Sequence, residues 1–201
     1  MIDVFNDAIR EYGYPGICFW GANLTKALPK LDAAIYVHAS AYFNPDVSGM
    51  YLEEKRINNI RTYDYDDVWN NILRTKPVEN MRTYYGGIVD QDDTPRRGKL
   101  GFCLTGVTPA KFQNYLYKLA LKNLSSDCEY LFIDAWNEWG EGNYLEPDEE
   151  HKYEYLEAVQ AVKKQLPDNI CEIEDQWKKI KNDSGTPVLA PIIKQLKKYK
   201  K

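Results

Sequence analysis

Apolar residues recur at helical spacing in four stretches of the chain. Local signals mark the ends of several of these stretches. Asp64 is placed to cap one of them, Thr108 followed by Pro109 begins another, and Gly13 follows the first. The pattern therefore predicts four helices, in residues 4–12, 63–73, 108–123 and 151–166.

Short apolar runs alternate with these helices. The strongest is "EYLFIDAW" (129–136), the near-continuous kind that a parallel sheet buries on both faces. We expect parallel strands near residues 16–20, 33–38, 78–85 and 129–135, in βα units. Residues 44–62 are polar and irregular and predict an excursion between elements. "IVDQDDTPRRGKLG" (88–101) predicts a long loop.

The amino-acid composition of the chain changes after Pro167. A linker-like piece, "KNDSGTPVLAP", is followed by "IIKQLKKYKK", which carries five lysines and no acidic residue. We therefore expect an α/β domain in residues 1–166 and a linker with a basic C-terminal tail in residues 167–201. That tail is expected to form a solvated helix or a frayed end, or to dock on an acidic or membrane surface.

Charge and cysteine usage exclude several classes of protein. The net charge of −4 argues against broad binding to nucleic acid. No stretch approaches the ~18 apolar residues of a membrane span, and the N-terminus does not resemble a signal peptide, so we expect a cytoplasmic protein. Four widely spaced cysteines and two histidines make a poor zinc set and predict reduced thiols.

The candidate chemistry lies in "DAWNEWGEGNYLEPD" (134–148), directly after the strongest strand. In parallel sheets, functional residues lie just beyond the carboxyl ends of the strands. Three interpretations of its acidic side chains are open. They are solvated charges near a helix start, oxygen ligands for Mg²⁺ or Ca²⁺ without the regular spacing of an EF-hand, or a pair of carboxyl groups for glycoside chemistry.

Glu138 and Glu141 are the candidate pair. They are three residues apart, so on a turn both side chains can face one pocket. Burial against Trp136 and Trp139, together with mutual repulsion, would raise one pKa and leave a proton to donate. Aromatic residues make up 13% of the chain, and their faces suit the C–H faces of sugars.

The same stretch, followed by "YLEAV", resembles the signature of the WbsX-type family, the glycosyltransferase WbsX or glycoside-hydrolase-99-like domain. "DDTPRRG" (92–98) resembles that family's preceding block, W-D-N-T-P-R-R, with Gln91 in place of Trp and Asp93 in place of Asn. "LDAAIYVHAS" (31–40) and "YDYDDVW" (63–69) resemble earlier blocks more weakly.

The resemblance implies a bacterial (β/α)8 barrel that acts on surface polysaccharide, O-antigen or capsule. "NEWGEG" is similar to the N-E-W-x-E-G element of the family 99 endo-α-mannosidases. That similarity makes Glu141 the acid/base and Glu138 the base that assists attack by the substrate's own 2-hydroxyl, with no metal or cofactor. The residues expected to bind the glycan or glycolipid substrate are Asp92, Arg96, Trp136, Asn137, Trp139, Tyr144 and Glu146.

A complete eight-fold barrel needs about 250 residues. We therefore expect the C-terminal part of the domain, a partial (β/α)8 TIM-like barrel with a C-terminal helical extension, and a partner chain that supplies the missing half. Two alternatives remain open. One is a metal-dependent nucleotide-sugar glycosyltransferase that uses the D-x-D of Asp90 and Asp92, and the other is a non-catalytic glycan-binding fragment.

Overall fold

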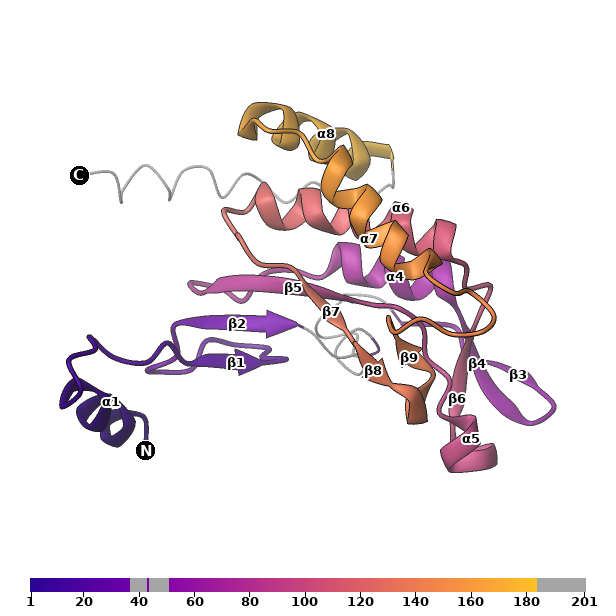
Figure 1. The fold of residues 1–201 in the computed structure, drawn as a ribbon, viewed down its shortest axis with the longest axis horizontal. Coiled ribbons are helices and arrows are strands. Elements are labelled where there is room, and N and C mark those ends of the chain that lie inside the picture. The colour runs from indigo at the N-terminus through magenta and orange to yellow at the C-terminus, as the bar shows by residue number, and fades with distance from the viewer. Residues whose placement is uncertain (37–42, 44–50, 184–201) are drawn as a thin grey trace.

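The computed structural model describes residues 1–36, 43 and 51–183. Its main sheet has four parallel strands in the order β1-β2-β5-β7 and curls as it crosses the molecule (Figure 1). These strands are β1 (Trp20–Ala22), β2 (Ala33–Tyr36), β5 (Arg82–Ile88) and β7 (Phe132–Asp134). The predicted parallel sheet is confirmed. The expected strand at residues 16–20 is wrong except at Trp20, where β1 begins, and β5 begins later than the expected range 78–85 and ends at Ile88. Residues 37–38 of the expected second strand lie outside the described part of the chain.

The four predicted helices are confirmed, with local caps at two of them. Asp64 accepts hydrogen bonds from the N–H groups of Asp66 and Asp67, and Thr108 accepts one from Lys111 N–H. Because these signals lie within a few residues of each helix start, the sequence alone shows them. The helices are α1 (Ile2–Arg10), α4 (Tyr65–Arg74), α6 (Pro109–Leu124) and α7 (Glu154–Gln165).

Three further strands lie outside the ranges that the sequence predicts as strands. β3 (Lys55–Ile57) pairs antiparallel with β4 (Ile60–Asp64), and β4 pairs in parallel with β6 (Phe102–Thr105). The irregular chain expected in residues 44–62 is therefore wrong for residues 55–57 and 60–62, whereas residues 44–50 lie outside the described part. These strands are short and carry no long apolar run, and β4 pairs with β6 about 40 residues further along the chain, so the local sequence pattern does not predict them.

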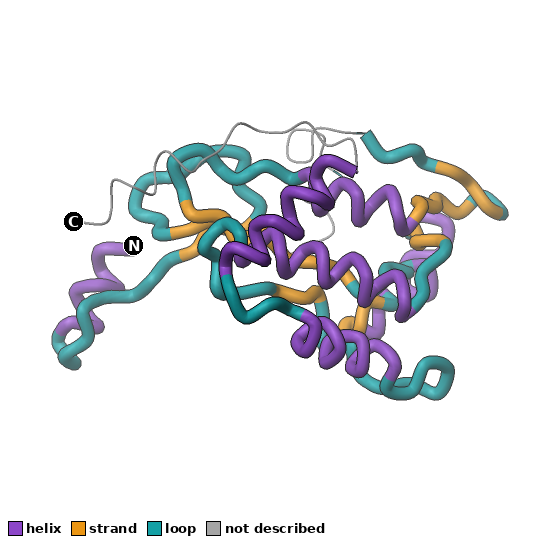
Figure 2. The backbone as a smooth tube through the Cα atoms, turned by 90° about the horizontal axis from the view of Figure 1, so that it is seen from above, coloured by secondary structure: helices purple, strands orange, loops and turns teal. Residues whose placement is uncertain are grey.

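Helices α4, α6 and α7 cover one face of the main sheet (Figures 1 and 2). Trp69, Phe112 and Leu119 are fully buried in this layer. Gly87 in β5 permits the close approach, because a Cβ there would lie 2.3 Å from the Trp69 ring. The main core therefore lies between the helices and this face of the sheet.

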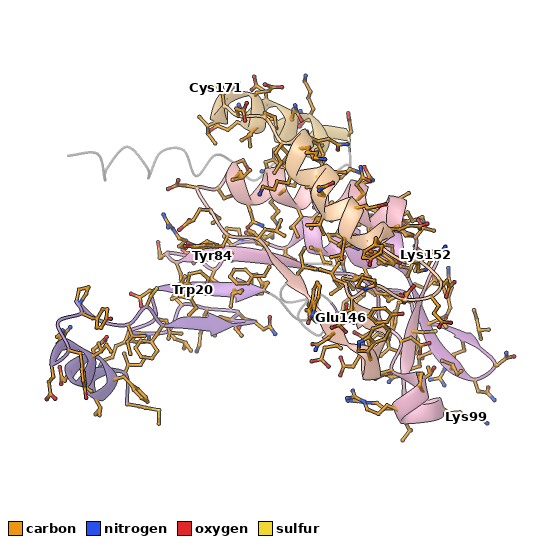
Figure 3. All side chains as sticks on the ribbon, viewed as in Figure 1. Trp20, Tyr84, Lys99, Glu146, Lys152 and Cys171 are labelled. Atoms are coloured by element: carbon orange, nitrogen blue, oxygen red, sulfur yellow. The ribbon has the colours of Figure 1, made fainter. Side chains whose placement is uncertain are left out.

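The opposite face of the sheet carries an aromatic cluster. Trp20 stacks on Tyr84 with ring centroids 4.4 Å apart, and Phe132 meets the Trp20 ring edge-on at 5.7 Å (Figure 3). Tyr84 belongs to this face because side chains alternate along a strand and Gly87 points to the helices. The sheet is thus apolar on both faces.

The chain continues after Pro167 as α8 (Ile170–Asp183). Ile173 and Trp177 of this helix are buried against Leu121 of α6. Residues 184–201, which include the lysine-rich end, lie outside the described residues. None of the helices in the described part is long and apolar enough to cross a membrane.

Candidate functional site

Two loops meet beyond the carboxyl ends of β5 and β7. The first runs from Val89 into α5 (Thr94–Arg97) and η1 (Gly98–Leu100), and Leu104 N–H donates to Gln91 O at 2.8 Å. The second contains the hairpin of β8 (Asn137–Glu138) and β9 (Asn143–Tyr144), with η2 (Trp139–Glu141) between them. Asp92 N–H donates to Glu141 O at 2.6 Å, which ties the two loops together.

Glu141 is held by side chains from the first loop. Arg96 Nη2 lies 2.5 Å from Glu141 Oε1, and Gln91 Nε2 lies 3.5 Å from Oε2. The Glu141 side chain is 20% exposed, and Gln91 is almost fully buried. The sequence therefore singled out two residues, Arg96 and Glu141, that the fold brings into direct contact.

The second arginine of the block has a separate partner. Arg97 Nε lies 3.2 Å from the buried carboxylate of Asp93, whose other oxygen accepts a hydrogen bond from Phe102 N–H. Asp92 Oδ1 accepts from the N–H and the hydroxyl of Thr94 at the start of α5. These aspartates shape the loop, and they orient Arg96 toward Glu141.

The aromatic residues of the site are only half covered. Trp136 is 53% exposed and Trp139 is 48% exposed. Trp139 stacks on Tyr144 at 3.7 Å and its Nε1–H donates to Glu146 Oε2 at 2.6 Å. Figure 3 shows Glu146 beside the β8–β9 hairpin, on the side of the sheet away from α6. The open ring surface is suited to stacking against a sugar.

Asn137 and Glu138 lie in β8 and are exposed. The Glu138 carboxylate makes no hydrogen bond or ion pair with the described residues. The expected burial against Trp136 and Trp139 is therefore not found for Glu138, whereas the Glu141 side chain is mostly covered and contacts Arg96 and Gln91.

Asp90 follows β5 directly and has a different environment from its neighbours. Burial raises its pKa to about 6, the charge of Asp92 adds to that effect, and a hydrogen bond from Gln91 N–H opposes it. Within the described part of the chain, no group of three His, Cys, Asp or Glu residues is arranged to hold a metal ion. The D-x-D of Asp90 and Asp92 thus has no third ligand of this kind beside it.

A profile of the family described as Glycosyltransferase WbsX matches residues 1–159. The chain belongs to this family. It is 30% identical over 136 residues, 65% of its length, to the protein WxcX of Xanthomonas campestris pv. campestris. The WxcX of a second strain is 29% identical over 144 residues, 67% of the chain.

These matches cover only 17% and 21% of the two WxcX proteins, so the chain spans about a fifth of their length. No solved structure matches the chain.

Proposed function

We propose that this chain is part of a carbohydrate-active domain that breaks or transfers a glycosidic bond of a bacterial surface polysaccharide, with Glu138 and Glu141 as the working carboxyl groups. The observation that supports it best is the position of Glu141. It lies beyond the ends of parallel strands, is oriented by Arg96 and Gln91, and neighbours two half-exposed indoles. Membership of the WbsX family supports the same substrate class.

The two glutamates lie at the two ends of one short turn. Glu138 precedes η2 and Glu141 ends it, and the proposed reaction requires both carboxyl groups to reach the same sugar. In the proposed reaction, Glu138 takes the proton of the substrate's 2-hydroxyl, and that oxygen attacks the anomeric carbon. Glu141 gives its proton to the departing oxygen as the glycosidic bond breaks.

Water or a sugar hydroxyl then attacks the anomeric carbon and gives its proton to Glu141. The bond between that carbon and the 2-oxygen breaks, and Glu138 returns its proton to the 2-oxygen. The acceptor alone decides between hydrolysis and transfer, so one site serves both outcomes. Arg96 pairs with Glu141 Oε1 in the free protein, and the arriving sugar would displace it. The faces of Trp136 and Trp139 would carry the sugar rings.

The domain architecture we propose is a partial (β/α)8 barrel. Four parallel strands with helices on one face correspond to part of such a barrel. A partner chain, or further segments of a longer polypeptide, would supply the remaining strands and part of the substrate contacts. A cytoplasmic location remains a prediction from the sequence.

The test is turnover of a polysaccharide by the chain together with the partner that completes the barrel. Glu138→Gln and Glu141→Gln should each lower turnover by about 10²–10⁴-fold, the usual contribution of general acid–base catalysis, and the double variant should lose little more. Glu149→Gln, a change of an exposed carboxylate in the same loop, is the matched control.

A chelator separates this mechanism from the transferase alternative. Turnover that survives EDTA fits the carboxyl pair, whereas a metal-dependent transferase stops. Full activity of both single variants would reject the proposed function.

A further inference from the structure

A small cavity of about 90 Å³ lies beside the loop that carries Glu141, and the reaction above does not use it. Its walls come from the end of β5, from the β8–β9 hairpin and from the start of α7. They include Asp90, Gly142, Tyr144, Asp148, His151 and Tyr155. Gly142 directly follows Glu141, and Tyr144 is the residue that stacks on Trp139. A sugar on the proposed site would therefore have the cavity beside it.

Tyr155 brings an unused polar group to this cavity. Its side chain is 92% buried, since it is only 8% exposed, and its ring is packed edge-on between Phe112 and His151. Its hydroxyl makes no hydrogen bond with the described residues, yet the residue lines the cavity. The hydroxyl is therefore free to form a hydrogen bond with a ligand or a water molecule that enters the cavity.

Asp90 brings the complementary group. Its Oδ1 accepts the hydrogen bond from Gln91 N–H at 2.6 Å, and within the described part of the chain its Oδ2 has no hydrogen-bond donor and no cationic partner. Asp90 and Tyr155 are close enough that the Asp90 charge helps to raise the pKa of Tyr155, after burial, which is the main cause. The cavity thus offers one free acceptor and one free donor.

Two other carboxylates line the cavity, and the Glu150 side chain is mostly exposed, whereas Asp148 already has partners. Asp148 accepts hydrogen bonds from the Tyr144 hydroxyl at 3.0 Å and from His151 N–H. It therefore fixes Tyr144 and the turn before α7. An alcohol group matches the pair formed by Asp90 Oδ2 and the Tyr155 hydroxyl, because a single hydroxyl donates one hydrogen bond and accepts another.

We propose that the cavity between Asp90 and Tyr155 is a subsite for one hydroxyl group of the sugar, which donates to Asp90 Oδ2 and accepts from the Tyr155 hydroxyl. The subsite rests on the proposed function for its substrate class, and it makes Asp90 and Tyr155 determinants of specificity. A sugar that lacks this hydroxyl forms neither hydrogen bond and binds more weakly.

The experiment measures equilibrium binding of methyl hexosides (the gluco, galacto and manno forms) and of their monodeoxy derivatives to the full chain by NMR. The Gly142 amide and the Asp90 carboxyl carbon are the local reporters. We expect at least one hexoside to shift both signals, and one of its deoxy derivatives to bind about tenfold more weakly or worse.

Tyr155→Phe should bind that hexoside and its deoxy derivative with nearly equal affinity, since the donor that distinguishes them is gone. Tyr153→Phe, which changes an exposed tyrosine nearby, should discriminate like the unchanged protein. Asp90→Asn keeps the shape of the side chain and should also weaken discrimination.

The subsite is rejected if no hexoside moves the Gly142 amide, or if Tyr155→Phe discriminates as the unchanged protein does. Glu141→Gln separates this result from the proposed reaction, because that variant should keep the discrimination and lose turnover. Intact turnover in Glu141→Gln with discrimination that depends on Tyr155 would reject the reaction and leave the subsite standing.

Discussion

At the scale of single residues, two adjacent arginines contact different carboxylates. Arg97 pairs with the buried Asp93 and so fixes the loop, whereas Arg96 reaches Glu141. Arg97 therefore has a structural role as the partner of Asp93, whereas Arg96 is available to the candidate site. Gln91, a departure from the family pattern, places its amide next to Glu141. No local signal could show that contact, because the two residues are 50 positions apart.

The buried Asp90 makes the free energy of unfolding depend on pH. Its pKa in the folded protein is about 6, above the value of about 3.9 in an unfolded chain. The folded state therefore holds the extra proton between these values, and the contribution of Asp90 to stability falls as the pH rises through this window. The titratable groups that interact with it include Asp92, His151, Tyr65, Cys103, Tyr144 and Tyr155.

Asp90→Asn should accordingly raise the free energy of unfolding at pH 7.5 by about 1–3 kcal/mol, from a pKa shift of about two units. The gain should shrink at pH 5, where Asp90 is mostly protonated in the folded protein. Urea denaturation of both proteins at the two pH values measures this. A gain that grows toward low pH would contradict the assigned environment of Asp90.

At the scale of elements, the sequence predicts a helix or a strand when the residues that determine it lie within or next to that element. The caps at Asp64 and Thr108 and the apolar run before Asp134 are local, and they predict α4, α6 and β7. The sequence does not predict strands β3, β4 and β6, because they are short and because β4 pairs with β6 far along the chain. Tyr155 is predicted only as part of the apolar side of a helix, although its hydroxyl lines a cavity.

Gly87 tests the packing between β5 and the helices. A methyl group there would lie 2.3 Å from Trp69 and 3.2 Å from Leu119, both fully buried. Gly87→Ala should therefore lower the free energy of unfolding by about 1–3 kcal/mol, the usual cost of overpacking a core. Gly140→Ala is the control, since its added methyl group meets no atom within 4 Å. Equal stability of the two variants in urea denaturation would contradict the described packing.

At the scale of the whole molecule, helices close one face of the sheet, while the opposite face carries the Trp20, Tyr84 and Phe132 cluster. The two site loops meet at the carboxyl end of this sheet, as the alternation of strands and helices predicts. Their contact depends on the curl of the sheet and on pairing between β4 and β6. These are properties of the assembled chain, which explains why the sequence predicts the place of the site better than its contacts.

The central claim is that Glu141 carries the proton to the departing oxygen. The most direct measurement compares the first turnover of two glycosides of the sugar that binds, one with a simple alkyl leaving group and one with 2,4-dinitrophenolate, which needs no proton. The chain together with its barrel partner is assayed as the unchanged protein and as Glu141→Gln. The account predicts a loss of about 10²–10⁴-fold on the alkyl glycoside and a far smaller loss on the dinitrophenyl glycoside. Equal first-turnover rates of the two proteins on the alkyl glycoside would contradict it.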